Sequence, residues 1–169
     1  MTRIHISAGG AVDCRSMLDV PLSAVSVWGQ IRDFRRFARL DFFHARIEID
    51  GDVPRAGAFL RMTHQFVFFK VQRIGRIAWW REGLGFSFSD LSLRGVRHGF
   101  PHVFGYRIRE TGPARCQVEV RVRGLWTARR VPRWLARLWL RWVFSHAVSN
   151  VNRQLLAYKL WRDRRPAIS

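Results

Sequence analysis

The stretch that decides the fold reads WTARRVPRWLARLWLRWVFSHAVSNVNRQLLAYKLWRDRR, residues 126–165. Val131-Pro132 can open a helix, because proline is tolerated in a first helical turn. From Trp134 no glycine or proline interrupts the chain until Pro166. About thirty residues, each rising about 1.5 Å, make a rod of roughly 45 Å. Such a rod can lie across a small domain, so we expect the rest of the chain to form a sheet that it covers.

The periodicity of this stretch predicts two helical faces. The face expected to meet the sheet comprises Leu135, Leu138, Trp142, His146, Ser149, Arg153, Leu156 and Leu160. The second face carries an arginine every fourth residue, beginning at Arg129. A basic helix with tryptophans has the composition of an interfacial helix on acidic lipid, so Arg133, Arg137 and Arg141 are candidate membrane contacts. The alternatives are a solvated face or phosphate contacts with nucleic acid, and no recognised binding motif supports nucleic acid.

The composition indicates one globular domain with an unusual surface. The chain has 169 residues, of which 48% are hydrophobic, and it contains 13 Phe and 8 Trp. These values fit a single domain whose rings fill a core or line an apolar cavity. The net charge is +18, and Lys70 and Lys159 are the only lysines among 30 basic residues. Such a field favours anionic partners, although arginines spread over an ordinary solvated surface give the same composition.

Cysteine usage and hydropathy bear on where the protein works. Cys14 and Cys116 match no zinc or redox spacing, so we expect two buried free thiols, or one disulfide if they fall on neighbouring strands. Residues 1–10 lack the apolar segment of a signal peptide. No run of 18 apolar residues exists, because Arg137 and Arg141 interrupt the only candidate. We therefore expect a soluble cytoplasmic protein that can also sit peripherally on a membrane.

The order of elements predicts an α+β fold. Residues 1–10 look like a flexible leader, followed by a single domain over residues 11–165. Alternation predicts a first strand at 11–20, and helix signals follow at 24–31 and 34–40. Further strands are expected at 45–49, 58–71, 74–81, 86–93, 100–108 and 116–122. Consecutive strands with tight turns indicate a curved antiparallel sheet, whose dry face the last helix would cover.

This order resembles the helix-grip fold of the START and Bet v 1-like (SRPBCC) superfamily. Within it, the chain is similar to the bacterial polyketide cyclase/dehydrase and lipid-transport group. The likeness rests on VPLSAVSVW at residues 20–28 and IRDF at 31–34, and it covers about residues 12–160. It implies a cavity between the sheet and the last helix, where many members bind apolar ligands and some cyclise polyketides. The superfamily shares no single catalytic signature, so no catalytic residue is carried over.

The inward positions of such a sheet form the candidate site. Mostly apolar positions with a few polar groups are usual for a small-molecule site. The candidate ligand-binding residues are Met62, Phe66, Phe86, Phe88, Phe104, Trp142, His146 and Ser149. Buried polar side chains must be hydrogen-bonded, so His64, His102 and Tyr106 should bond each other, water or a ligand, unless the backbone satisfies each separately. In an enzyme one histidine would act as general base, which makes these three the catalytic candidates.

Three functions remain open at this point. The first is binding or transport of an apolar small molecule, lipid or polyketide-like, by a protein that docks on acidic membranes. The second is a polyketide cyclase or dehydratase, and the third is a basic module for an acidic protein or nucleic acid. No cofactor is expected, because Gly83 and Gly85 lack the rest of a phosphate-binding loop. No metal site is expected either, and the acids Glu82 and Asp90 are expected to be solvated.

Overall fold

The computed structural model describes residues 2–40, 44–51, 53–65, 70–91, 100–128 and 131–164. Within these ranges the chain forms β1 (Thr2–Ile6), β2 (Ala11–Val20), α1 (Ala24–Ile31), α2 (Phe34–Leu40), β3 (His44–Ile49), β4 (Phe59–Gln65), β5 (Lys70–Arg81), β6 (Gly85–Leu91), β7 (His102–Gly112), β8 (Arg115–Leu125) and α3 (Arg133–Asp163). Every helix and strand expected from the sequence has a counterpart. The single expected strand at 58–71 is divided, because β4 ends at Gln65 and β5 begins at Lys70, and residues 66–69 lie outside the described ranges.

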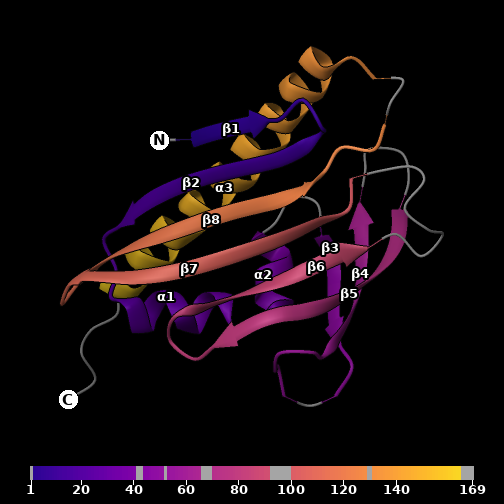
Figure 1. The fold of residues 1–169 in the computed structure, drawn as a ribbon. Helices are drawn as coiled ribbons and strands as arrows, with labels where there is room; N and C mark the ends of the chain where they lie inside the picture. The colour runs from indigo at the N-terminus through magenta and orange to yellow at the C-terminus, as the bar shows by residue number, and fades with distance from the viewer. Residues whose placement is uncertain are drawn as a thin grey trace.

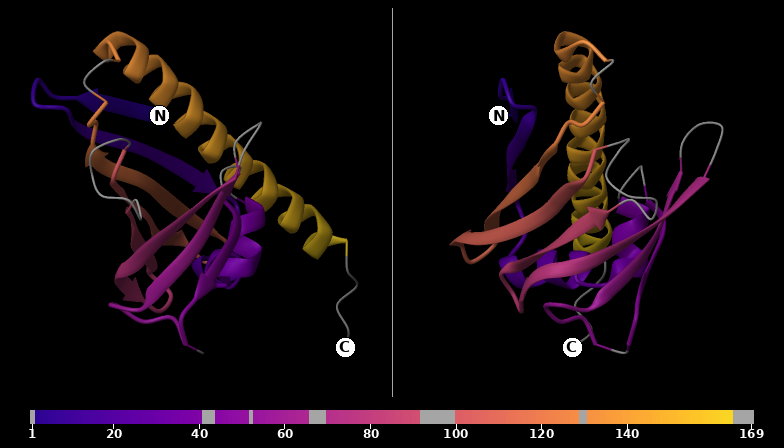
Figure 2. Two further views of the ribbon diagram at one scale, coloured as in Figure 1. Left: turned by 90° about the vertical axis from the view of Figure 1, so that its right-hand side faces the viewer. Right: turned by 45° about the vertical axis from the view of Figure 1, so that its right-hand side comes forward.

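All eight described strands form one antiparallel sheet in the order β1-β2-β8-β7-β6-β5-β4-β3. Strands β3 to β8 follow one another as hairpins, and β2 joins the far side by pairing with β8 from Ala11↔Leu125 to Val20↔Cys116. The sheet bends around α3, with α1 and α2 near one end of the helix (Figure 1 and Figure 2). The α+β fold and the curved meander predicted from alternation are therefore confirmed.

The expectation of a flexible leader is wrong for the first described residues. Thr2–Ile6 form β1, which pairs with β2 from Thr2↔Ser16 to Ile6↔Val12. The side chain of Ile6 is buried in the core, and the glycines at 9 and 10 belong to the turn between the two strands. This run is only five residues long, too short for its alternation to stand out from the Ala/Gly stretch that follows it.

Helix α3 covers the concave face of the sheet, but it does so with the face opposite to the predicted one. Its buried residues are Ala136, Leu140, Phe144, Ala147, Val148, Val151 and Leu155. Leu138 and Trp142, predicted to meet the sheet, are 55% and 51% exposed. The small side chains of Ala136 and Ala147 allow the helix to approach the strands closely. The predicted face was wrong because large apolar residues occupy both sides of this helix, so their spacing fixes the period but not the side that faces inward.

Aromatic rings fill the interior beside α2. Phe37 packs its ring 5.2 Å from that of Tyr106 and 5.4 Å from that of Phe86. Phe34 lies 5.0 Å from Phe86, and Phe104 lies 4.9 Å from Tyr106. Edge-to-face and tilted pairs at these distances are favourable packing. This part of the space between the sheet and the helices is therefore solid core.

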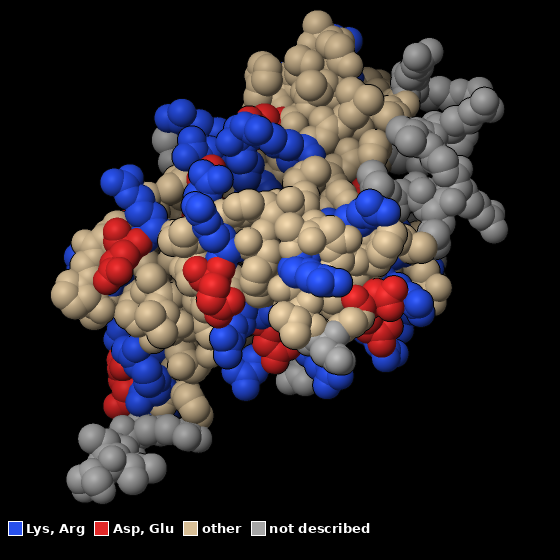
Figure 3. Space-filling view, turned by 60° about the horizontal axis from the view of Figure 1, so that its bottom comes forward, with Lys and Arg blue, Asp and Glu red and all other residues tan. Residues whose placement is uncertain are grey.

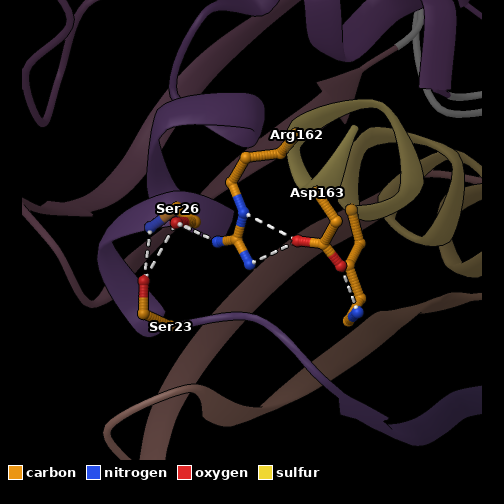
Figure 4. Close-up of polar contacts among 5 residues, drawn as sticks. Ser23, Ser26, Arg162 and Asp163 are labelled. Atoms are coloured by element: carbon orange, nitrogen blue, oxygen red, sulfur yellow. Dashed lines mark hydrogen bonds and ion pairs between the residues drawn. The ribbon is translucent and has the colours of Figure 1, made fainter. Parts of the chain in front are cut away.

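The C-terminal end of α3 is tied to α1. Ser23 caps α1 by accepting a hydrogen bond from the Ser26 backbone N–H at 3.3 Å. Arg162 on α3 donates to Ser26 Oγ at 3.4 Å and to Asp163 Oδ1 at 3.2 Å (Figure 4). These contacts link the first helix to the last one, although 136 residues separate the two partners. They fix the end of α3 that lies away from the hollow described next.

Candidate functional site: a cavity with a buried charged cluster

An apolar cavity of about 100 Å³ lies between the sheet and α3. It begins where the aromatic core ends. The sheet contributes Cys14, His64, Arg73, Asp90, Phe100, His102, Phe104 and Val122, and α3 contributes Trp139, Leu140, Val143, Phe144 and Ala147. The helix side of the cavity is thus entirely non-ionisable, whereas the sheet side carries a group of polar side chains. The wider hollow between α2 and β3 is a surface groove whose rim includes the ion pair of Arg32 with Glu82.

Asp90 on β6 is the centre of the polar group, and its side chain is 0% exposed. His64 Nε2 on β4 lies 3.1 Å from Asp90 Oδ2, and Arg73 Nη1 on β5 lies 3.1 Å from Asp90 Oδ1. A buried carboxylate is tolerated only when its charge is paired and its oxygens are hydrogen-bonded. Arg73 supplies the opposite charge and donates a hydrogen bond to Asp90 Oδ1, and the His64 ring lies within ion-pair distance of the other carboxylate oxygen. Three neighbouring strands therefore each contribute one member of the cluster.

His102 on β7 completes the charged cluster, which we define as His64, Arg73, Asp90 and His102. His102 Nδ1 lies 2.8 Å from the carbonyl oxygen of Phe100. A carbonyl oxygen only accepts hydrogen bonds, so Nδ1 carries the proton of this bond. The ring stacks on Phe100 with centroids 4.8 Å apart, and Nε2 lies 3.7 Å from Asp90 Oδ2. His102 is thus held at the cavity by its backbone contact and faces the carboxylate with its other nitrogen.

Two glycines allow these strands to approach closely enough for the cluster to form. Gly75 is the register partner of Asp90, and a Cβ atom there would lie 2.0 Å from the carbonyl oxygen of Ser89. Gly124 is the register partner of His102, and a Cβ atom there would lie 2.7 Å from the Cβ of His102. Both distances are far below van der Waals contact, so any larger residue would displace the strands.

The structure brings together two of the three predicted catalytic residues. His64 and His102 both face Asp90 in the cavity. Tyr106 does not join them, because its ring is packed against Phe37 in the aromatic core. Of the predicted ligand-binding residues, Phe104 lines the cavity, whereas Met62, Phe86 and Phe88 are buried core residues that do not. Phe66 lies outside the described residues.

The three predicted ligand-binding residues on the last helix are not at the site. Trp142, His146 and Ser149 are exposed on the outer face of α3, away from the sheet. The physical reason is that α3 turns the opposite face toward the sheet. The helix residues that reach the cavity are instead Trp139, Val143 and Phe144, which lie close to Trp142 in the sequence but point in other directions around the helix. Arg133, Arg137 and Arg141, the predicted membrane contacts, are exposed as expected.

Sequence reasoning missed Arg73 and misjudged Asp90 as solvated. Asp90 continues the inward series of Phe86 and Phe88 on β6, where alternation calls for an apolar residue. Arg73 occupies the inward series of β5 that continues with Gly75 and Ile77. The available signal was an acidic residue at an inward position of one strand, β6, and a basic residue at an inward position of the adjacent strand, β5. That signal can be used only once the strands are known to pair in this register.

The two cysteines are buried free thiols, as expected. They do lie on the neighbouring strands β2 and β8, but Cys14 pairs with Val122 and Cys116 pairs with Val20. Six residues of strand, about 20 Å, separate them, which excludes a disulfide. Burial, helped by the charge of Asp13, raises the pKa of the Cys14 thiol to about 12. Cys14 therefore presents an uncharged thiol to the cavity.

Two classes of feature have no counterpart among the residues that the structure describes. No set of three or more His, Cys, Asp or Glu side chains there is arranged to hold a metal ion. No described helix is long and apolar enough to cross a membrane.

Comparison with solved structures gives the fold of the chain. The Zhui aromatase/cyclase from Streptomyces sp. R1128 superposes with a TM-score of 0.70 at 13% identity, over 91% of this chain and 96% of that one. Human STARD10 gives a TM-score of 0.65 at 12% identity, over 97% of this chain and 76% of that one. A START superfamily protein from Mycobacterium smegmatis gives 0.67 at 13% identity, over 86% and 98%.

No family model matches the chain, and no curated protein matches it. The structural likenesses, all at low identity, confirm the predicted helix-grip fold of START and Bet v 1-like proteins. What the chain does is therefore inferred from its own residues.

Proposed function

We propose that this helix-grip protein binds a compact apolar small molecule in the cavity between the sheet and α3, with the polar end of the ligand against the charged cluster. The observation that carries the proposal is a buried Asp–Arg–His group at one side of an otherwise apolar hollow. Burying ionised groups is costly, and a core that only had to be filled would be built from apolar side chains instead. Apolar walls supply affinity and a few polar groups supply orientation in typical small-molecule sites.

The size of the cavity limits the ligand. A volume of about 100 Å³ is of the order of a single aromatic ring. The rings of Phe34, Phe37 and Phe86 close the space beyond it. We therefore favour a ring-bearing, polyketide-like molecule, or the end of a single acyl chain, over a lipid with two acyl chains.

Ligand capture can be tested on the purified protein. Solvent extraction followed by mass spectrometry should reveal a co-purifying apolar compound, and a dansyl-labelled undecanoic acid should bind saturably. Ala147 is buried and lines the cavity, whereas Ala157 is exposed on the same helix. Ala147→Leu should therefore weaken binding of the probe at least tenfold, and the matched variant Ala157→Leu should leave it unchanged. Equal binding by both variants would place the ligand elsewhere.

The same cluster supports a second candidate function, that of a polyketide cyclase or dehydratase. His102 lines the cavity, and His64 contacts Asp90 at 3.1 Å, which gives imidazoles oriented for proton transfer. General acid–base catalysis of this kind contributes roughly 10²–10⁴-fold to a rate. If the protein turns over an aromatic polyketide precursor, His102→Gln should slow the reaction by about that factor while the ligand still binds. Unchanged turnover in folded His64→Gln and His102→Gln variants would remove this candidate.

Docking on an acidic membrane is favoured by the outer face of α3. Trp134, Leu138 and Trp142 are 65%, 55% and 51% exposed there, and they lie beside the exposed Arg137 and Arg141. Large apolar side chains flanked by arginines are typical of helices that lie in a lipid interface. A second copy of this chain is a poor partner, because pairing two such faces would bring their arginines together in a protein of net charge +18.

Vesicle sedimentation tests this docking. The protein should bind vesicles of phosphatidylcholine with phosphatidylglycerol and not vesicles of phosphatidylcholine alone. The double variant Trp134→Ser and Trp142→Ser should bind at least tenfold more weakly. The control is Val25→Ser with Val53→Ser, which removes exposed apolar surface on other elements. Equal loss in both double variants, or binding to nucleic acid or an acidic protein in place of vesicles, would refute the proposal.

A further inference from the structure

The members of the charged cluster differ in how far their side chains are exposed, and this decides which of them a ligand can touch. The Asp90 side chain is fully buried behind its partners, whereas those of Arg73 and His102 are 17% and 15% exposed. All three residues line the cavity, but the Asp90 side chain has no exposed surface, so a molecule in the cavity touches Arg73 and His102 rather than the carboxylate. The opposite wall, on α3, offers it only apolar side chains and the indole of Trp139.

From this arrangement we infer that the ligand is an acid, held through a carboxylate by Arg73 with His102 beside it. The inference rests on the proposed function and names the class of ligand. A guanidinium has five N–H donors and no acceptor, and the contact with Asp90 Oδ1 uses one of the donors. The polar end of the ligand must therefore accept hydrogen bonds. The planar donors of arginine match the two oxygens of a carboxylate.

The charges around the cavity favour an anion over a neutral or cationic group. Arg73 and Asp90 cancel each other, and protonation of either His64 or His102 makes the cluster positive. Cys14 does not oppose this, because burial raises the pKa of its thiol to about 12 and keeps it uncharged. A carboxylate that enters the cavity can thus be balanced by one imidazolium. An ammonium group would meet Arg73 with no accessible carboxylate to pair with it.

A matched pair of probes tests the inference on the unmodified protein. Benzoic acid and benzamide have the same shape and one ring each, and only the acid is anionic at neutral pH. Calorimetric titration should show the acid binding at least tenfold more tightly. Equal affinities, or a preference for the amide, would overturn the acid assignment and leave the proposed function intact. Failure of both compounds to bind would count against the proposed function, and the acid assignment would fall with it.

Two arginines on β5 provide the variant test. Arg73 faces the cavity, whereas Arg76 lies on the other side of the same strand with its guanidinium 4.2 Å from the ring of Phe59. Arg73→Gln should reduce acid binding to the level of the amide, and Arg76→Gln should leave the tenfold preference in place. The two variants lose the same charge, so an equal reduction in both would mean that only the long-range field of the protein acts. That result would overturn the inference.

Discussion

Asp90 is the residue on which the charged cluster depends. Its side chain is 0% exposed and contacts both His64 and Arg73. Removing one partner of a buried ion pair leaves the other charge without compensation, which typically costs about 3–5 kcal/mol. Asp90→Ala should therefore lower the free energy of unfolding, measured with urea, by about 3 kcal/mol. The exposed Asp50 serves as control, and a loss from Asp90→Ala as small as that from Asp50→Ala would contradict the ion-pair assignment.

Gly75 and Gly29 should respond to alanine in opposite directions. At Gly75 the added Cβ would lie 2.0 Å from the Ser89 carbonyl oxygen, so the hairpin of β5 and β6 must shift. At Gly29, inside α1, nothing lies within 4 Å of the added atom. We expect Gly75→Ala to destabilise the protein by more than 2 kcal/mol, roughly the cost of overpacking. Gly29→Ala should stabilise it by up to about 1 kcal/mol, since alanine favours helix. Thermal denaturation of both variants makes the comparison.

The two thiols make stability fall at alkaline pH. Burial raises the pKa of Cys14 from 9.0 to about 12 and that of Cys116 from 9.0 to about 11. The unfolded chain therefore loses these protons first, so the thiols destabilise the fold progressively as pH rises above 9. Each thiol contributes up to about 1.4 kcal/mol per pH unit in that window. In the double variant Cys14→Ala and Cys116→Ala, the free energy of unfolding should decline less steeply between pH 9 and 11 than in the unmodified protein. An equal slope in the two proteins would contradict the raised pKa values of the thiols.

At the scale of elements, local patterns predicted the helices and strands because each was long and regular. The alternation of Cys116, Val118, Val120 and Val122 shows directly in β8 as a buried series. The helical run after Trp134 is uninterrupted, so the length of α3 was also predictable. The side of α3 that faces the sheet was not, because that choice depends on packing against distant strands. Leu138 and Phe144 are equally apolar in the sequence, yet only Phe144 is buried.

The orientation of α3 can be checked with two truncations. Phe144 is 3% exposed and Trp142 is 51% exposed. Phe144→Ala should cost about 3–5 kcal/mol of unfolding free energy, the usual penalty for emptying a buried ring site. Trp142→Ala, two residues away, should cost less than about 1 kcal/mol, because it leaves no cavity. Urea denaturation of both proteins decides the matter, and a larger loss from Trp142→Ala would mean that the helix is rotated as the sequence pattern first suggested.

At the scale of the whole molecule, the candidate site was only half predictable. Alternation placed His64 and His102 on the dry face, and both reach the cavity. Their meeting point depends on how β4, β5, β6 and β7 stagger, and the chain encodes this through glycines such as Gly75 and Gly124 that tolerate close strands. The extent of the hollow was not predictable either. Phe86 and Phe88 have the same alternation as cavity-lining residues, but they meet the rings of α2 and fill space.

The surplus of positive charge acts on the whole molecule. On the face drawn in Figure 3, basic side chains are dispersed with fewer acidic ones between them, and the net charge of the protein is +18. Exposed pairs such as Arg32 with Glu82 stabilise little, because solvent screens them. Repulsion among unmatched arginines should therefore dominate the electrostatics of folding at low ionic strength.

Stability should consequently rise with salt. The Debye length falls from about 30 Å at 0.01 M to about 10 Å at 0.1 M, so salt in this range screens repulsion between distant arginines. The urea midpoint should increase between these two concentrations, and urea is suitable because it adds no ions. A variant with Arg61→Gln and Arg76→Gln, both exposed, should be less sensitive to salt. A urea midpoint that falls as salt is added would mean that attraction within ion pairs such as Arg15 with Glu119 outweighs the repulsion. The surplus arginines would then not destabilise the fold, and no anionic partner would be needed to offset their charge.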